Sequence, residues 1–152
     1  MKITIAWIGK TKEPAIQALT DEYLKRLTRY AHVAGVALRD ETKLLEFCGR
    51  SGTKKSGTSP RSTLVIMDAG GRELTSEQFA KFVGEYRDRN PQPLVFGIGA
   101  ADGFSETTKR AAQSTLSLGK LTLAHELARV VLLEQIYRAF TILGGHPYHS
   151  GH

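Results

Sequence analysis

The chain has 152 residues, of which 41% are hydrophobic and 24% charged, a composition typical of one globular domain. Its longest apolar runs have four residues, so it lacks the long apolar stretch of an integral membrane protein. The single cysteine, Cys48, excludes an internal disulfide and favours the reducing cytoplasm. We expect Cys48 to be a small half-buried hydrophobic residue rather than a catalytic thiol.

Basic residues give the chain a formal net charge of +6. Such a charge favours an anionic partner such as nucleic acid, although it also serves solubility. The cations gather in three clusters: Lys10 and Lys12; Lys25, Arg26 and Arg29; and Arg50, Lys54, Lys55 and Arg61. The third cluster lies in a stretch rich in Gly, Ser and Lys, residues 49–61, which predicts a flexible basic loop. That loop is either a plain surface excursion or a segment that grips RNA.

Apolar periodicity predicts the elements of the first half of the chain. A β-branched run predicts a strand over residues 2–9, and apolar residues at helical spacing predict a helix over residues 13–28. A second strand is expected at 33–38 and a short helix around 44–47, ending at Gly49. No internal repeat is visible.

In the second half of the chain, predicted strands and helices continue to alternate. The apolar run 62–68 predicts a buried strand ended by Gly70-Gly71, and Thr75 with Gln78 forms a capping-box pattern for the next helix. The remaining predicted elements are a helix over 76–89, a strand over 94–98, a helix over 106–114 capped by Ser105, a strand with a loop over 116–123, and a helix over 124–143 that ends at Gly144-Gly145. The alternation predicts an α/β fold with a mainly parallel sheet.

In open α/β sheets, ligands bind beyond the carboxyl ends of the strands. Three segments of this chain fall there: the turn after Asp68, the glycine-rich turn 99–103, and the segment 116–123. Glycine lets the backbone approach a ligand closely, so Gly97, Gly99 and Gly103 favour a nucleotide-like ligand. The spacing lacks the third glycine of a dinucleotide fingerprint, and tight turns between strand and helix are the more ordinary explanation of these glycines.

The last helix carries a pair of opposite charges. Glu134 and Arg138 are four residues apart and can pair along one helix face. The pair either stabilises the helix alone or places Arg138 near an anionic substrate with Glu134 positioning it. His125 precedes the apolar part of this helix and is interpreted as a core or capping residue.

The tail contains three histidines, His146, His149 and His152, without a cysteine or a firm carboxylate beside them, so we expect no metal site. Aromatic rings stack on splayed RNA bases and histidine titrates near neutrality, so His146, Tyr148 and His149 are better placed as RNA contacts or proton-transfer groups.

Three motifs carry a family resemblance: residues 116–125 (Leu-Ser-Leu-Gly-Lys-Leu-Thr-Leu-Ala-His), 134–139 (Glu-Gln-Ile-Tyr-Arg-Ala) and 146–149 (His-Pro-Tyr-His). They resemble the ribosomal RNA large subunit methyltransferase H family, pseudouridine N3-methyltransferases of the SPOUT superfamily. The likeness covers the chain except residues 40–61.

The resemblance implies a single SPOUT methyltransferase domain over residues 1–152, a parallel α/β sheet with a C-terminal trefoil knot, and a homodimer. It implies that S-adenosylmethionine lies in the knot. The cofactor positions carried over are Met67, Gly99, Leu118, Gly119, Lys120, Leu121, Thr122 and Leu123.

For activity, the resemblance implies S-adenosylmethionine-dependent methylation of N3 of pseudouridine 1915 (reference bacterial numbering) in helix 69 of 23S ribosomal RNA, on assembled ribosomes in the cytoplasm. The candidate catalytic residues are Arg138, Tyr148, His149 and Glu134. A related enzyme acting on another ribosomal or transfer RNA position, or a noncatalytic RNA-binding relative, remains the alternative.

The chain departs from the family pattern at three places. Ala100 follows Gly99 where two glycines are usual, and Ser150 replaces a basic residue after the Tyr-His ending. The Gly/Ser/Lys stretch replaces a helical, acidic segment. These departures concern the turn beside the cofactor, a phosphate contact of the tail, and a contribution of residues 49–61 to the RNA site.

Overall fold

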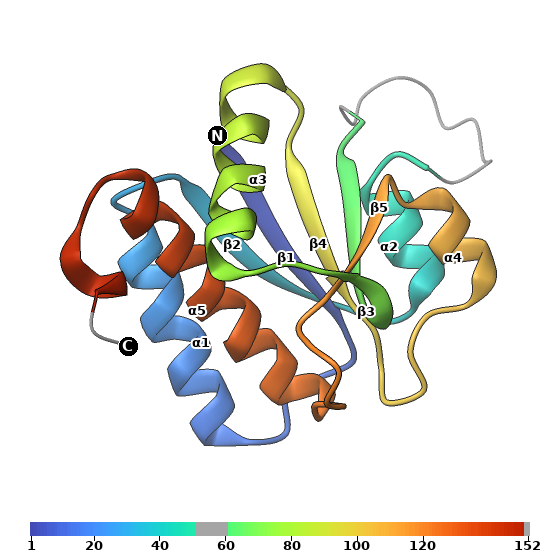
Figure 1. The fold of residues 1–152 in the computed structure, drawn as a ribbon. Coiled ribbons are helices and arrows are strands. Elements are labelled where there is room, and N and C mark those ends of the chain that lie inside the picture. The colour runs from blue at the N-terminus through green and yellow to red at the C-terminus, as the bar shows by residue number, and fades with distance from the viewer. Residues whose placement is uncertain (51–60, 151–152) are drawn as a thin grey trace.

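The computed structural model describes residues 1–50 and 61–150. Within them the chain forms a five-stranded parallel sheet with the strand order β2-β1-β4-β3-β5 (Figure 1). This arrangement confirms the predicted α/β fold with a mainly parallel sheet. The strands are β1 (Lys2–Ile8), β2 (His32–Leu38), β3 (Thr63–Glu73), β4 (Leu94–Ile98) and β5 (Ser114–Ser117).

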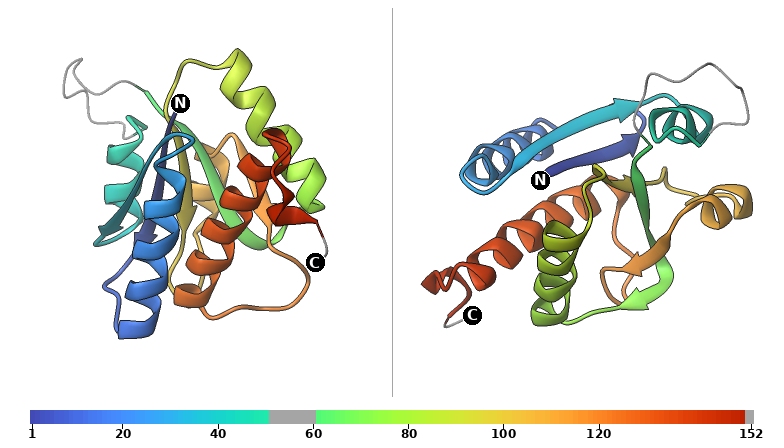
Figure 2. Two further views of the ribbon diagram at one scale, coloured as in Figure 1. Left: turned by 90° about the vertical axis from the view of Figure 1, so that its left-hand side faces the viewer. Right: turned by 90° about the horizontal axis from the view of Figure 1, so that it is seen from above.

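Helices cover both faces of the sheet, with α1, α3 and α5 on one side and α2 and α4 on the other (Figure 2). Their bounds are α1 (Pro14–Leu27), α2 (Glu41–Phe47), α3 (Ser76–Arg89), α4 (Glu106–Ala111), α5 (His125–Leu143) and the 3-10 helix η1 (Pro147–His149). None of the described helices is both long and apolar enough to cross a membrane. The trefoil knot, which the family resemblance implies for this fold, stays a prediction.

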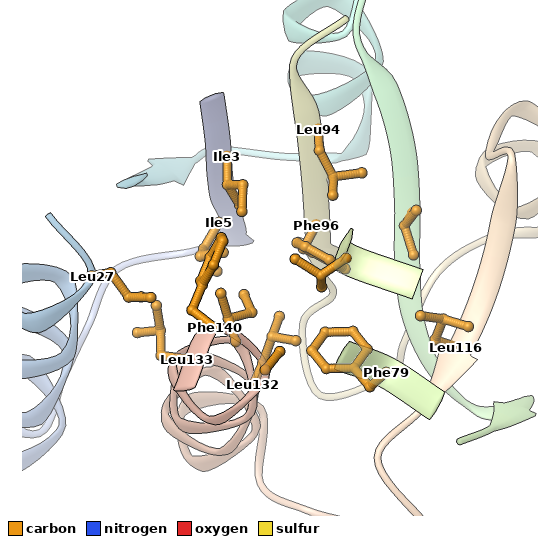
Figure 3. Packing of buried hydrophobic residues seen from close by; sticks show 14 of the residues in the cluster. Ile3, Ile5, Leu27, Phe79, Leu94, Phe96, Leu116, Leu132, Leu133 and Phe140 are labelled. Carbon is orange, nitrogen blue, oxygen red and sulfur yellow. The ribbon is translucent and has the colours of Figure 1, made fainter. Parts of the chain in front are cut away.

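Alternating side chains of the central strands build one core on each face, because successive residues of a strand point to opposite sides. Ile3, Ile5 and Phe96 face the larger core, where they meet Leu132 of α5 and Phe79 of α3 (Figure 3). The smaller core lies under α2 and α4.

Cys48 is fully buried in the smaller core. Burial raises the pKa of its thiol to about 11, so at neutral pH it is an uncharged, inert side chain. This confirms the prediction that Cys48 packs as a hydrophobic residue, although it is more deeply buried than expected.

Side-chain caps start α3 and α4 where the sequence predicts them. The Thr75 hydroxyl accepts from the Gln78 amide at 3.1 Å, and the Gln78 side chain accepts from the Thr75 amide at 2.9 Å. Ser105 Oγ accepts from the Thr108 amide at 3.3 Å. Each bond satisfies a backbone donor that has no partner inside its helix.

Three predicted boundaries are wrong. Strand β3 does not end at Gly70-Gly71 but continues to Glu73, α4 ends at Ala111 rather than near 114, and β5 occupies 114–117 rather than 116–123. The helix stops early because the Gln113 amide donates to Leu64 O at 2.8 Å and its side chain accepts from the Leu64 amide at 3.1 Å. The chain therefore joins the sheet at Gln113, three residues before Leu116.

Only part of the third basic cluster lies within the described residues. Residues 51–60, most of the predicted flexible loop, lie outside them. Arg50 does not extend into solvent: its guanidinium donates to Ala111 O at 3.1 Å and to Ser62 O at 2.9 Å. Burial lowers the pKa of Arg50. It therefore joins α2 to the start of β3 and the end of α4, and is not a free contact for RNA.

A bulge allows β5 to pair with two parts of β3. Leu116 pairs with Met67 before the bulge and with Arg72 after it. Gly71 lies between them, and a Cβ there would come within 2.8 Å of the backbone of Thr115 and Leu116. Real Cβ atoms essentially never approach that closely, so glycine is required for the two strands to cross here.

We expect Gly71→Ala to destabilise the protein by about 1 to 3 kcal/mol, because β5 would have to move away from β3. Gly70→Ala is the matched control, since its added methyl group meets only a side-chain oxygen of Asp68, at 3.1 Å, and no backbone atom. Urea unfolding of the two variants measures the difference. Equal stability would contradict the close crossing at Gly71.

Candidate functional site

A cleft of about 260 Å³ lies at the carboxyl edge of the sheet. Its walls are the three segments that strand-end reasoning selects, and the first turn of α5 closes it. The lining residues are Met67, Asp68 and Ala69 within β3; Ile98 at the end of β4 with Gly99, Ala100, Ala101, Asp102 and Gly103 after it; Ser117 at the end of β5 with Leu118, Gly119, Leu121, Thr122 and Leu123 after it; and His125 and Ala128 of α5.

Nearly all residues expected to hold the cofactor line this cleft. Met67, Gly99, Leu118 and Gly119 do so together with residues 121–123. Lys120 is exposed and is not among the lining residues. The structure thus brings the positions together, while their role in binding a cofactor stays a prediction.

The turn after β4 depends on two of its glycines. The Gly103 amide donates to Ala100 O at 2.9 Å, and Gly103 has a φ of +76°. A Cβ on Gly99 would lie 3.1 Å from the carbonyl carbon of Gly103, so the turn closes tightly only with glycine at 99. Ala100 does not have a positive φ, so alanine fits there without backbone strain.

The side chain of Ser117 stabilises the turn after β5. Ser117 Oγ donates to Gly119 O at 2.7 Å and accepts from the Gly119 amide at 3.1 Å. Gly119 has a φ of +132°, which disfavours any residue with a side chain. A second cavity of about 240 Å³ shares Met67, Ser117, Leu118 and Gly119 with the cleft, so residues 117–119 form a thin wall between the two.

Sequence reasoning missed two polar residues of the cleft. Asp68 Oδ2 accepts from the Gly70 amide at 3.0 Å, and its Oδ1 lies 3.8 Å from Lys109 Nζ. A polar residue directly after a buried strand was the available signal for it. His125 was interpreted as a core or capping residue; it is neither, since Ala124 is the cap of α5 and His125 is half-buried in the cleft wall.

A second group of polar side chains surrounds Glu134 on α5. Glu134 Oε1 accepts from Arg138 Nε at 3.0 Å and Nη2 at 2.5 Å, and from the Tyr148 hydroxyl at 3.2 Å. The other carboxylate oxygen accepts from Gln135 Nε2 at 2.9 Å. The expected ion pair is therefore present, and Glu134 also fixes the tail by holding Tyr148.

Electrostatics define the protonation of this group. The hydrogen bond to Glu134 raises the pKa of Arg138, which stays a cation. Burial, then hydrogen bonding with Tyr23 and the charge of Glu134, raise the pKa of Tyr148 far above its usual range. Tyr148 is consequently protonated at neutral pH and acts as a hydroxyl donor, which excludes its phenolate as a base there.

The tail itself forms one turn of 3-10 helix. His146 Nδ1 accepts from the Tyr148 amide at 3.1 Å and caps that turn. The side chain of His149 and the whole of His152 lie outside the described part of the chain. In the described ranges, no group of three or more His, Cys, Asp or Glu residues is placed to hold a metal ion.

The structure does not bring the two predicted groups into one site. His125 and Ala128 at the start of α5 line the cleft, whereas Arg138 is ten residues beyond Ala128, about 15 Å along the helix axis. Figure 1 shows the start of α5 at the loop after β5 and its far end beside η1. Within a single chain, the cofactor positions and the candidate catalytic residues lie toward opposite ends of α5.

A parallel sheet with a glycine-lined cleft beyond its strand ends defines an α/β protein with a cleft where proteins of this class hold their ligands. Comparison with known proteins gives the family. A family model described as a predicted SPOUT methyltransferase matches residues 1–149.

Ribosomal RNA large subunit methyltransferase H of Koribacter versatilis is 53% identical over 152 residues, covering 100% of both chains. Its counterpart from Trichlorobacter lovleyi is 42% identical and covers 98% of this chain and 99% of the relative. The chain therefore belongs to the ribosomal RNA large subunit methyltransferase H family of SPOUT methyltransferases.

Solved structures agree with this fold. The SpoU methyltransferase AviRb of Streptomyces viridochromogenes, in complex with AdoMet, matches with a TM-score of 0.53 and 15% identity over 90% of this chain and 57% of its own. A probable methylase family protein of Haemophilus influenzae matches with a TM-score of 0.59 and 11% identity, over 96% and 69%. This chain thus spans little more than half of AviRb, and the likeness shows the fold.

We expect Gly119→Trp to abolish cofactor binding, because its side chain would fill the cleft from the 117–119 wall. Gly119→Ala is the control: it adds the backbone strain of a positive φ but leaves the cleft open, so binding should persist. Calorimetry with S-adenosylmethionine measures both variants, and circular dichroism verifies that they are folded. Wild-type affinity in Gly119→Trp would exclude this cleft as the binding site.

Proposed function

We propose that this chain transfers the methyl group of S-adenosylmethionine to N3 of pseudouridine 1915 in helix 69 of 23S ribosomal RNA, on assembled ribosomes in the cytoplasm. The observation that carries the proposal is the 53% identity over the full length of a ribosomal RNA large subunit methyltransferase H. The cleft between the strand ends supports it, because its walls coincide with the positions that the family resemblance assigns to the cofactor.

The residues of the cleft fit S-adenosylmethionine. Leu118, Leu121 and Leu123 offer apolar surface for the adenosine, and the glycine turns expose backbone donors and acceptors for its polar edges. Asp68 adds a carboxylate, which complements the positive charge of the sulfonium and ammonium groups. When bound, the cofactor supplies a methyl group activated by the neighbouring positive sulfur.

Methyl transfer needs the N3 atom aligned with that methyl group and freed of its proton. Arg138 can hold the RNA near its target base, with Glu134 fixing the guanidinium through two hydrogen bonds. Tyr148 offers a ring for stacking and a hydroxyl that stays protonated. His149 supplies an imidazole, the side chain most often used to accept a proton in catalysis.

A homodimer reconciles these roles with the geometry. Since one chain separates the cleft from Arg138 by about 15 Å along α5, a second copy is needed to bring the tail of one protomer to the cleft of the other. Leu19 of α1 and Leu127 of α5 are large apolar side chains that are each 44% exposed, and their burial between two copies favours such a dimer.

Incubation with ribosomes that lack the modification tests the activity. The protein should transfer one methyl group per ribosome to the 23S RNA in the presence of S-adenosylmethionine. Mass spectrometry of nuclease fragments locates the methyl group. Modification of a different nucleotide would replace the proposed target with another RNA position. Cofactor binding without any transfer to ribosomes or transfer RNA would indicate a noncatalytic RNA-binding relative.

His149→Ala should reduce methyl transfer by roughly 100-fold, the usual contribution of a proton-transfer group, while the affinity for S-adenosylmethionine stays at the wild-type value. His32→Ala at the exposed start of β2 is the matched control and should leave both unchanged. Single-turnover rates on ribosomes and calorimetry measure the two quantities. An unchanged rate in His149→Ala would remove this side chain from the reaction.

A further inference from the structure

A basic cleft at the end of α1 takes no part in the site described above. Its volume is about 420 Å³, and it lies between the last turns of α1 and the middle of α5. The second basic cluster of the sequence supplies half of its lining residues. The lining residues are Glu22, Lys25, Arg26, Thr28, Arg29 and Tyr137.

Two of the three cations in this cleft are free to bind an anion. Arg26 Nε donates to Glu22 at 3.0 Å, so its charge is already paired. Lys25 and Arg29 are exposed and form no ion pair within 4.0 Å among residues 1–50 and 61–150. Lys25 lies in the last turn of α1 and Arg29 just beyond the end of this helix, and both line the same cleft.

The ordinary explanation for basic residues here is the negative end of the helix dipole, which attracts cations. That explanation accounts for the charges but not for the aromatic wall of the cleft. Arg26 lies 5.2 Å from the centre of the Tyr23 ring and 5.7 Å from that of Tyr137. Of these groups, the Arg26 guanidinium and the Tyr137 ring line the cleft and give it a preformed surface beside the two free cations.

The same rings connect this cleft to the tail. The centroids of Tyr137 and Tyr148 are 4.7 Å apart in an edge-to-face arrangement, and Tyr148 bonds to Glu134. Arg138 lies over the Tyr148 ring at 5.2 Å. The basic cleft therefore opens beside the residues proposed to hold the target base.

We propose that Lys25 and Arg29 bind backbone phosphates of the RNA strand next to the target nucleotide. The proposal rests on the proposed function for RNA as the substrate. Phosphate contacts from exposed Lys and Arg position a nucleic acid without reading its sequence, and a neighbouring aromatic ring offers a base a stacking surface. These contacts fix where the RNA strand lies relative to Tyr148 and Arg138, and compensate for the lack of a basic residue at Ser150.

Salt dependence of RNA binding tests this surface, because each lost phosphate contact lowers the slope of log affinity against log salt by about 1. The probes are ribosomes lacking the modification and a labelled single-stranded RNA. The double variant K25A/R29A should show a slope smaller by about 2 than the wild type. The charge-preserving variant K25R/R29K should keep the wild-type slope. Affinity for S-adenosylmethionine and the oligomeric state should not change in either.

The double variant R89A/R110A is the matched control, because it removes the same charge from exposed ends of α3 and α4. Its slope should equal that of the wild type. If the slope fell equally in both alanine variants, the loss of net charge alone would explain it, and the proposal would be overturned. The proposal would also be overturned if K25A/R29A kept the wild-type slope or no longer formed the dimer. It would be overturned as well if the wild type bound neither RNA.

The test separates this surface from the proposed activity. Methyl transfer by the wild-type chain decides the activity, whereas the difference in slope between the two alanine double variants decides the phosphate contacts. A wild type that methylates ribosomes while both alanine variants keep its slope would refute the phosphate contacts alone. A reduced slope in K25A/R29A without any methyl transfer by the wild type would refute the activity alone.

Discussion

The close crossing of β5 over β3 at Gly71 determines where the cleft lies. Leu116 can pair with both Met67 and Arg72 only because β3 bulges between them and Gly71 has no side chain. This crossing directs the chain after β5 across the edge of the sheet. Residues 117–123 then face the turn that follows β4. The cofactor positions come from three separate segments of the chain, and this arrangement brings them around one cleft.

Helix α5 joins the two candidate regions, and one buried arginine fixes its start. Arg129 is 1% exposed, its guanidinium lies 3.7 Å from the centre of the Trp7 ring, and it donates to Thr11 Oγ1 at 2.7 Å. The Lys12 amide donates to Glu126 at 2.6 Å. Burial lowers the pKa of Arg129, and the ring and the hydroxyl offset part of the cost of burying its charge. The turn after β1 is thus tied to the helix whose first turn closes the cleft.

Local signals in the sequence predicted most elements. The capping box at Thr75 gave the start of α3, and Gly144-Gly145 gave the end of α5, because caps involve only residues a few positions apart. The end of α4 and the extent of β5 were predicted wrongly, because Gln113 bonds to Leu64, a residue 49 positions earlier. Likewise, Gly70-Gly71 had the pattern of a strand end, while pairing with β5 keeps both in the strand.

By itself, the sequence determined the α/β class, the three walls of the cleft and the Glu134–Arg138 pair. Each follows from a local property of the chain: the spacing of apolar residues, the alternation of strands with helices, and the four-residue spacing along a helix. Only the tertiary structure decided that Lys120 is exposed outside the cleft and that Asp68 and His125 line it. It also decided that Tyr148 meets Glu134 and that a basic cleft lies between α1 and α5. These arrangements depend on which distant residues pack together, and spacing along one chain carries no information about that.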